Sequence, residues 1–88
     1  YYKAGAFGIR IENLVLVRAA AIDGAEGDFL ELENLTWAPL EPRLIDTDLL
    51  APSEIAWVND YHVQVRKIIG VQLDGDDKAW LESVCQPL

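Results

Sequence analysis

The sequence of 88 residues contains no methionine, one cysteine and one histidine. Because the first residue is Tyr1 rather than methionine, we expect the chain to be part of a longer protein. Cys85 has no second cysteine to pair with, which fits a reducing compartment and favours a cytoplasmic location. Nothing in the sequence brings His62 to this thiol, so we interpret Cys85 as a structural residue and not as a nucleophile.

Long apolar runs and an excess of positive charge are also missing. No stretch approaches the roughly 18–20 apolar residues of a membrane span, and the start lacks the basic and apolar segments of a signal peptide. Seven basic and fifteen acidic side chains leave a net charge of −8. This charge repels phosphate backbones and anionic lipid surfaces, so neither nucleic acid nor membrane is an expected partner.

Apolar residues are abundant, at 51% of the chain. A chain of this length buries only about 60–65% of the surface that it exposes when unfolded. We therefore expect some of its apolar surface to face a partner or another part of the same protein.

Two segments have the composition of β-strands. Residues 7–17 (FGIRIENLVLV) are rich in β-branched residues, and their second half is apolar on both faces, as in an interior strand that is covered on both sides. Residues 29–38 (FLELENLTWA) alternate between apolar and polar, and Pro39 ends the run. Asp23-Gly24 and Gly27 predict a turn between the two segments, so we expect an antiparallel hairpin.

The second half of the chain has helical patterns. Residues 40–51 are interpreted as an ordered connector pinned by the apolar residues Leu44, Ile45, Leu49 and Leu50. Pro52 suits the first position of a helix, which we expect to reach the vicinity of Leu73 with Gly70 ending or loosening it.

A short last helix is predicted over residues 78–85, with Trp80, Leu81 and Val84 turned inward. The predicted fold is therefore α+β, an antiparallel hairpin followed by two helices. We expect it to form one compact unit.

Glu12 is the residue that needs an explanation, because it lies in the middle of an apolar strand pattern. A buried carboxylate without a partner costs several kcal/mol, so Glu12 needs a compensating positive charge. Arg10 lies two residues earlier on the same predicted face, at about 7 Å along a strand. The spacing alone favours a structural Arg10–Glu12 ion pair. A divalent metal ion bound to Glu12, with Arg10 orienting the carboxylate, is the alternative.

The opening run YYKAGAFGIRIENLVLV resembles the end of the catalytic domain of Xaa-Pro aminopeptidases, the aminopeptidase P family. The later runs LIDTDLL, WVNDYHVQVRKIIG and CQPL resemble the C-terminal extension of the long, cytosolic type of these enzymes. The resemblance implies a piece of the "pita-bread" metallopeptidase fold, with residues 1–40 ending the catalytic domain and residues 41–88 forming the extension.

The resemblance also implies roles for three residues. Glu12 matches the last of five metal ligands, a glutamate that bridges two divalent ions, typically Mn²⁺. Arg10 matches an arginine that holds the acidic ligands by hydrogen bonding, and Tyr2 matches a tyrosine of the same network. The other ligands, two aspartates, a histidine and a glutamate, would all precede this chain. His62 lies beyond the ligand region and is expected to pack in the helical part.

The function implied is that of a hydrolase, a metalloprotease that removes the N-terminal residue of peptides with proline at the second position. The chain alone, with one ligand of five, is expected to be inactive and to hold no metal. Two alternatives stay open. The helices after Pro52 form an association module, as in dimeric relatives of the enzyme, or the protein is a non-catalytic pita-bread relative. Retention of Arg10 and Glu12 argues against the second alternative.

Overall fold

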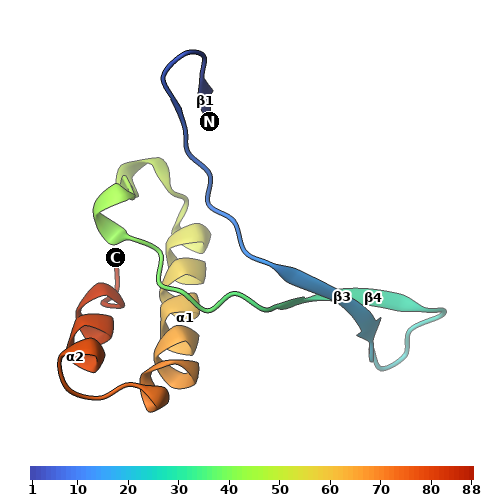
Figure 1. The fold of residues 1–88 in the computed structure, drawn as a ribbon. Coiled ribbons are helices and arrows are strands. Elements are labelled where there is room, and N and C mark those ends of the chain that lie inside the picture. Colours follow the sequence, from blue (N-terminus) through green and yellow to red (C-terminus); the bar gives the residue numbers. More distant parts are fainter. The chain divides into compact units, whose positions relative to one another are not determined.

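The computed structural model describes all 88 residues, which form two compact units, Tyr1–Thr36 and Trp37–Leu88. The first unit contains two antiparallel strand pairs and the second contains two α-helices, which confirms the predicted α+β class (Figure 1). The chain thus divides after Thr36 and does not form the single unit that the sequence predicted. The domain boundary after residue 40, which concerns the longer protein, stays a prediction.

A short hairpin at the start of the chain was not predicted from the sequence. Strands β1 (Tyr2–Lys3) and β2 (Phe7–Gly8) pair antiparallel, with Tyr2 opposite Gly8. The turn between them places Gly5 at a φ of 69°, a conformation that glycine adopts without steric cost. Beyond the strands, Tyr1 and Ile9 exchange two hydrogen bonds through the terminal ammonium and the backbone, at 2.9 and 2.8 Å.

The predicted antiparallel hairpin is confirmed by β3 (Val15–Ala20) and β4 (Phe29–Asn34). Arg18 lies directly opposite Glu31 in this ladder. Its guanidinium contacts the carboxylates of Glu31 at 2.7 Å and Glu33 at 3.0 Å. These cross-strand ion pairs add to the backbone ladder in holding the register.

The prediction of one continuous strand over residues 7–17 is wrong. Residues 9–14 carry no regular strand and separate β2 from β3. A strand forms only where a neighbour accepts and donates its backbone hydrogen bonds, and β4 offers such a neighbour only to residues 15–20. The β-branched composition of the segment therefore did not suffice to make it a strand.

The second predicted strand, residues 29–38, also ends early, at Asn34. The side chain of Thr36 accepts a hydrogen bond from the backbone N–H of Leu14 at 2.8 Å, and the Asn34 side-chain amide donates to the carbonyl of Thr36. Together with a backbone hydrogen bond from the N–H of Leu35 to the carbonyl of Leu14 at 2.8 Å, these side-chain contacts close this end of the hairpin.

The β3–β4 hairpin leaves apolar side chains exposed on both faces. Val15, Leu16 and Val17 are each about half exposed, and Leu30 and Leu32 more so. The prediction of an interior strand covered on both sides is therefore wrong for this chain by itself. Apolar surface of this kind is typical of a contact with another part of a protein or with a partner.

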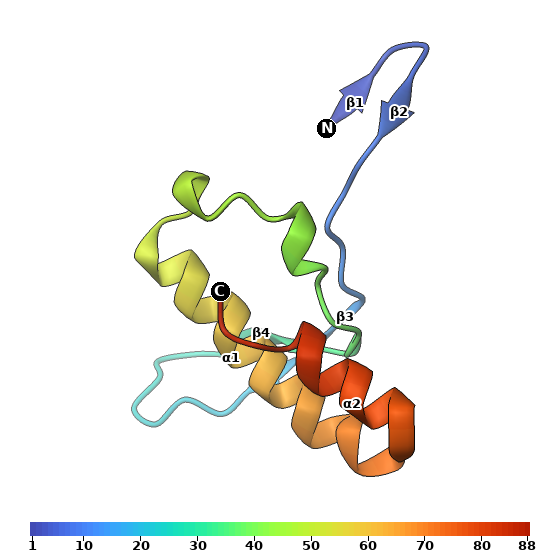
Figure 2. The same cartoon turned by 90° about the vertical axis from the view of Figure 1, so that its left-hand side faces the viewer.

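The two helices of the second unit lie side by side (Figures 1 and 2). Helix α1 (Pro52–Ile68) begins at a proline, and the carboxylate of Glu54 accepts a hydrogen bond from the Ala51 N–H at 2.8 Å. A 3₁₀ turn over Gly70–Gln72 follows α1, as the glycine predicted, and α2 spans Gly75–Val84. The two helices enclose a small core of Tyr61, Val65, Leu81 and Cys85.

The connector consists of two 3₁₀ turns, Pro42–Leu44 and Thr47–Leu49. The side chains of Glu41 and Asp46 cap these turns by accepting backbone N–H groups two residues later. Ile45 and Leu50 are half-buried, but the prediction that Leu44 and Leu49 pin the connector is wrong, because both are about four-fifths exposed. Hydrogen bonds within each turn, and not apolar burial of these two leucines, order this segment.

The prediction that Trp80 is turned inward is also wrong, because this residue is 57% exposed, whereas the neighbouring Leu81 is buried. Consecutive helical residues point about 100° apart, so the helix does not turn both toward the small core.

Neither α1 nor α2 combines the length and the apolar character that crossing a bilayer requires.

A candidate metal-ligand cluster of Tyr2, Arg10 and Glu12

The three residues singled out from the sequence lie together in the first unit. The Nε of Arg10 lies 3.0 Å from Oε1 of Glu12, which is the ion pair that the spacing predicts. The guanidinium carbon of Arg10 lies 5.9 Å from the centre of the Tyr2 ring, within reach of a cation–π contact. Arg10 therefore connects the carboxylate of Glu12 to the aromatic ring of Tyr2.

Gly8 makes room for this arrangement. It lies opposite Tyr2 in the first hairpin, and a Cβ atom at this position would lie 2.7 Å from Cδ1 of the Tyr2 ring. The absent side chain lets the ring lie over the backbone of β2, two residues before Arg10. A glycine at position 8 is thus a local requirement of the cluster.

The carboxylate of Glu12 is not buried. The side chains of Glu12 and Arg10 are 59% and 58% exposed, whereas the apolar pattern around Glu12 predicted burial. The cause is the missing strand over residues 9–14, which leaves Glu12 without a covering neighbour. An ion pair this exposed contributes little to stability, in the range of about 0–1 kcal/mol.

The chain contains no group of three or more histidine, cysteine or acidic side chains placed to hold a metal ion. Glu12 nevertheless has the chemistry of one ligand, because ionised carboxylate oxygens are the donors that hard divalent cations prefer. The contact to Arg10 is made at Oε1, and such contacts orient carboxylate ligands in metal sites. Glu12 thus has the chemistry of a single ligand, and these 88 residues supply no complete ligand set around it.

His62 belongs to the helical unit, as predicted, and is fully buried there. Its Nε2 accepts a hydrogen bond from the backbone N–H of Leu40 at 3.1 Å, while Nδ1 is buried without a hydrogen-bond partner. Burial, together with the positive charge of Arg66, lowers the pKa of His62. The imidazole is therefore neutral and structural.

Cys85 is buried in the core between α1 and α2. Burial raises the pKa of its thiol, so the thiolate that a nucleophile requires is disfavoured. This placement agrees with the structural role that the sequence indicated.

An aromatic stack in the second unit was missed in the sequence. The ring of Tyr61 lies between those of Trp37 and Trp57, with centroids 5.6 and 5.4 Å away and planes nearly parallel. The spacing of four between Trp57 and Tyr61 is the signal that was available, because residues four apart share a helix face. Trp37 is brought to the stack only by the tertiary fold.

Comparisons with known proteins point to one family. Residues 28–88 match the family described as the C-terminal region of peptidase M24. The chain is 42% identical over 91 residues to Aminopeptidase P1 of Lotus japonicus and 38% identical over 90 residues to Aminopeptidase P1 of Arabidopsis thaliana. It is 39% identical over 92 residues to a probable Xaa-Pro aminopeptidase P of Coprinopsis cinerea.

These three alignments cover the whole chain, including the Tyr2, Arg10 and Glu12 cluster that precedes residue 28. They cover only 14–15% of each relative. The chain thus corresponds to about one seventh of the length of these proteins.

Proposed function

The chain belongs to the C-terminal region of the peptidase M24 family, and we propose that it is the carboxyl-terminal part of an Xaa-Pro aminopeptidase. This enzyme would remove the N-terminal residue from peptides that have proline at the second position. The observation that carries the proposal is the contact of Arg10 with both Glu12 and Tyr2, in a segment aligned with the named aminopeptidases.

In this proposal Glu12 is a metal ligand that bridges two divalent ions, with Mn²⁺ as the expected metal. Such ions, when bound, would lower the pKa of a shared water and polarise the carbonyl group before the proline. Two aspartates, a histidine and a glutamate from the longer protein would complete the ligand set. Glu12 contributes an ionised carboxylate whose exposure leaves room for these partners.

Arg10 and Tyr2 act through Glu12 and not on the substrate. The guanidinium of Arg10 fixes one carboxylate oxygen of Glu12 at 3.0 Å, which sets the direction of the other. The ring of Tyr2, with its centre 5.9 Å from the guanidinium carbon, restricts the rotation of this group. Both are positioning residues, and the loss of such a residue typically costs 10- to 100-fold in metal affinity or activity.

The experiment uses the full-length protein with the substitution Glu12→Gln, which keeps the shape of the side chain but removes its charge. We expect a fall in kcat/KM of about 10²–10³-fold on an Xaa-Pro peptide, together with loss of bound metal. Arg10→Lys should give a smaller fall that added Mn²⁺ partly restores. Glu26→Gln, an exposed acid in the same unit, is the matched control and should change neither quantity.

Full activity and full metal content in Glu12→Gln would contradict the assigned role. A longer protein without the Asp, Asp, His and Glu set would favour the non-catalytic relative instead.

The 88-residue chain by itself is expected to be inactive, because one carboxylate does not hold either ion. Calorimetric titration with Mn²⁺ should show no stoichiometric binding in the micromolar range. Micromolar binding that Glu12→Gln abolishes would show that this segment assembles a site without the rest of the protein.

We further propose a cytoplasmic protein that forms a homodimer through its C-terminal region. The cytosolic type of enzyme that the chain resembles supports the location. The exposed apolar side chains of Trp57 and Val71 support a role in association, which is the second candidate function. Sedimentation of the full-length protein and of a form ending before Pro52 would test it, and equal masses per assembly would contradict it.

A further inference from the structure

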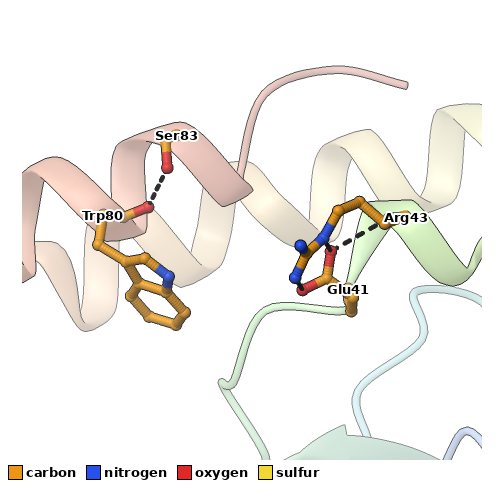
Figure 3. Close-up of polar contacts among 4 residues, drawn as sticks. All are labelled: Glu41, Arg43, Trp80 and Ser83. Atoms are coloured by element: carbon orange, nitrogen blue, oxygen red, sulfur yellow. Dashed lines mark hydrogen bonds and ion pairs between the residues drawn. The ribbon is translucent and has the colours of Figure 1, made fainter.

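A surface groove in the helical unit has no part in the metal-ligand cluster. It encloses about 390 Å³ between the first 3₁₀ turn of the connector and the last turns of α2. Glu41, Pro42 and Arg43 form one side, and Trp80, Ser83 and Val84 form the other. Figure 3 shows the Trp80 indole and the Glu41–Arg43 pair on the two sides of this space.

The one carboxylate in this groove, that of Glu41, accepts hydrogen bonds from Arg43 through both of its oxygens. Oε1 of Glu41 accepts from the backbone N–H and the Nε of Arg43 at 3.1 and 2.8 Å, and Oε2 accepts from Nη2 at 3.1 Å. The side-chain hydrogen bond from Arg43 is the main reason that the pKa of Glu41 falls to about 2. The pair is therefore locally neutral, and both of its carboxylate oxygens already accept hydrogen bonds.

Two donors of the groove, on Arg43 and Trp80, are available by contrast. The side chain of Arg43 is 87% exposed, and its Nη1 takes no part in the contacts to Glu41. The indole of Trp80, more than half exposed, has only an N–H to offer, because Nε1 is a donor and never an acceptor. The hydroxyl of Ser83 is directed to the carbonyl of Trp80 at 2.7 Å.

The groove thus combines a flat aromatic surface and N–H donors with its one carboxylate already satisfied. A proline-rich segment has the complementary chemistry. Its backbone has carbonyl groups but few N–H groups, and its polyproline II conformation is formed before binding. Exposed aromatic rings in grooves are the usual docking surface for such segments.

We propose that this groove docks a proline-rich peptide segment of a partner protein, flanked by basic residues. Proline rings stack on the Trp80 indole, and backbone carbonyls of the peptide accept from Trp80 Nε1–H and from Arg43 Nη1. The flanking basic residues complement the net charge of −8 and speed association. The binding needs neither Glu12 nor a metal, so it is independent of the peptidase proposal.

The test is a titration of the full-length protein with a decaproline peptide that carries two arginines at each end. The control peptide has alanine in place of every proline and the same arginines. The readouts are calorimetry and the indole N–H resonance of Trp80. We expect saturable binding of the proline peptide, a shift of that resonance, and at least tenfold weaker binding of the alanine peptide.

Trp80→Ala should weaken the affinity for the proline peptide at least tenfold, as buried tryptophan contacts in interfaces do. Trp57→Ala is the matched control, because Trp57 is equally exposed but lines a different groove with Leu50, Ser53 and Glu54. It should leave the affinity within twofold. Trp80→Phe keeps a ring without the N–H and should give an intermediate loss, which covers the case that Trp80→Ala does not fold.

Three outcomes would overturn the proposal. They are no saturable binding up to millimolar peptide, equal binding of the two peptides, and equal losses in the Trp57 and Trp80 variants. Self-association that covers the indole of Trp80 would overturn it too, since a second copy of the chain would then be the occupant. Sedimentation of the protein at the titration concentrations detects such self-association and distinguishes it from binding of the peptide.

Discussion

The backbone N–H of Leu40 donates a hydrogen bond to Nε2 of the fully buried His62, at 3.1 Å. Because Nε2 accepts, the proton of the neutral imidazole must be on Nδ1. A second proton on Nε2 would face the Leu40 N–H directly and break this bond. The hydrogen bond thus holds the first residue of the connector to α1 only while His62 is neutral.

The first prediction concerns pH and stability. Burial lowers the pKa of His62 below its ordinary 6.5, so the unfolded chain binds more protons than the folded chain between these two values. The stability that the neutral imidazole contributes is therefore complete above pH 6.5 and is lost as the pH falls below it. Urea unfolding curves between pH 7.5 and 5.0 should show this loss, with a slope of at most about 1.4 kcal/mol per pH unit from this residue.

The control for this prediction is His62→Gln, which removes the titrating group but leaves the carboxylates in place. Its stability should depend less on pH in the same window. An identical slope in the variant and in the original chain would assign the pH dependence to other groups.

The second prediction concerns Tyr61, whose hydroxyl donates to the carbonyl of Ala38 at 2.7 Å. Tyr61→Phe keeps the stacked ring but removes this donor, so the free energy of unfolding should fall by about 0.5–1.5 kcal/mol. Chemical denaturation measures the change. Tyr1→Phe, at an exposed tyrosine, should have an effect near zero, and equal effects of the two substitutions would contradict the prediction.

The third prediction concerns Gly8. A methyl group at this position would meet the Tyr2 ring at 2.7 Å, so in Gly8→Ala the exposed ring should swing away from the backbone and from Arg10. The ring-current shift of the Arg10 δ protons should disappear from the proton NMR spectrum, and stability should fall by no more than the roughly 0.5–1 kcal/mol of an exposed cation–π contact.

Gly70→Ala serves as the comparison for Gly8→Ala. There the new methyl group lies 3.6 Å from Leu81, an ordinary contact, and the Arg10 resonances should stay in place. Unchanged Arg10 δ shifts in Gly8→Ala would show that the ring does not depend on this glycine.

The fourth prediction concerns Cys85. The buried thiol with its raised pKa should react with an aromatic disulfide reagent at pH 8 at least about tenfold more slowly in the folded chain than in urea. Absorbance of the released thiolate follows both rates. Equal rates with and without urea would show that the core between α1 and α2 opens freely.

Local signals in the sequence predicted much of the fold. Pro52 and Gly70 mark the start of α1 and the turn that follows it, because their backbone preferences act within one or two residues. The hairpin of β3 and β4 followed from alternation and from the glycines between the strands. The first hairpin was missed, since two strands of two residues each have no periodicity to detect.

The candidate site divides in the same way. The spacing of two between Arg10 and Glu12 was sufficient to predict their ion pair. The placement of Tyr2 rested on the family resemblance alone, and it is Gly8 that brings its ring within reach of Arg10. No sequence pattern predicted the groove of Trp80 and Arg43, because its two sides are almost forty residues apart in the sequence.

The sequence by itself thus determined the α+β class, the order of the second hairpin and the two helices, the family and the pairing of Arg10 with Glu12, all of which depend on local pattern or on similarity. Only the tertiary structure decided which apolar residues are covered. Leu81 and Cys85 are buried while Trp80 and Leu44 are exposed, although all four are apolar. Burial depends on which surfaces meet, and 88 residues provide too few neighbours to cover every apolar side chain.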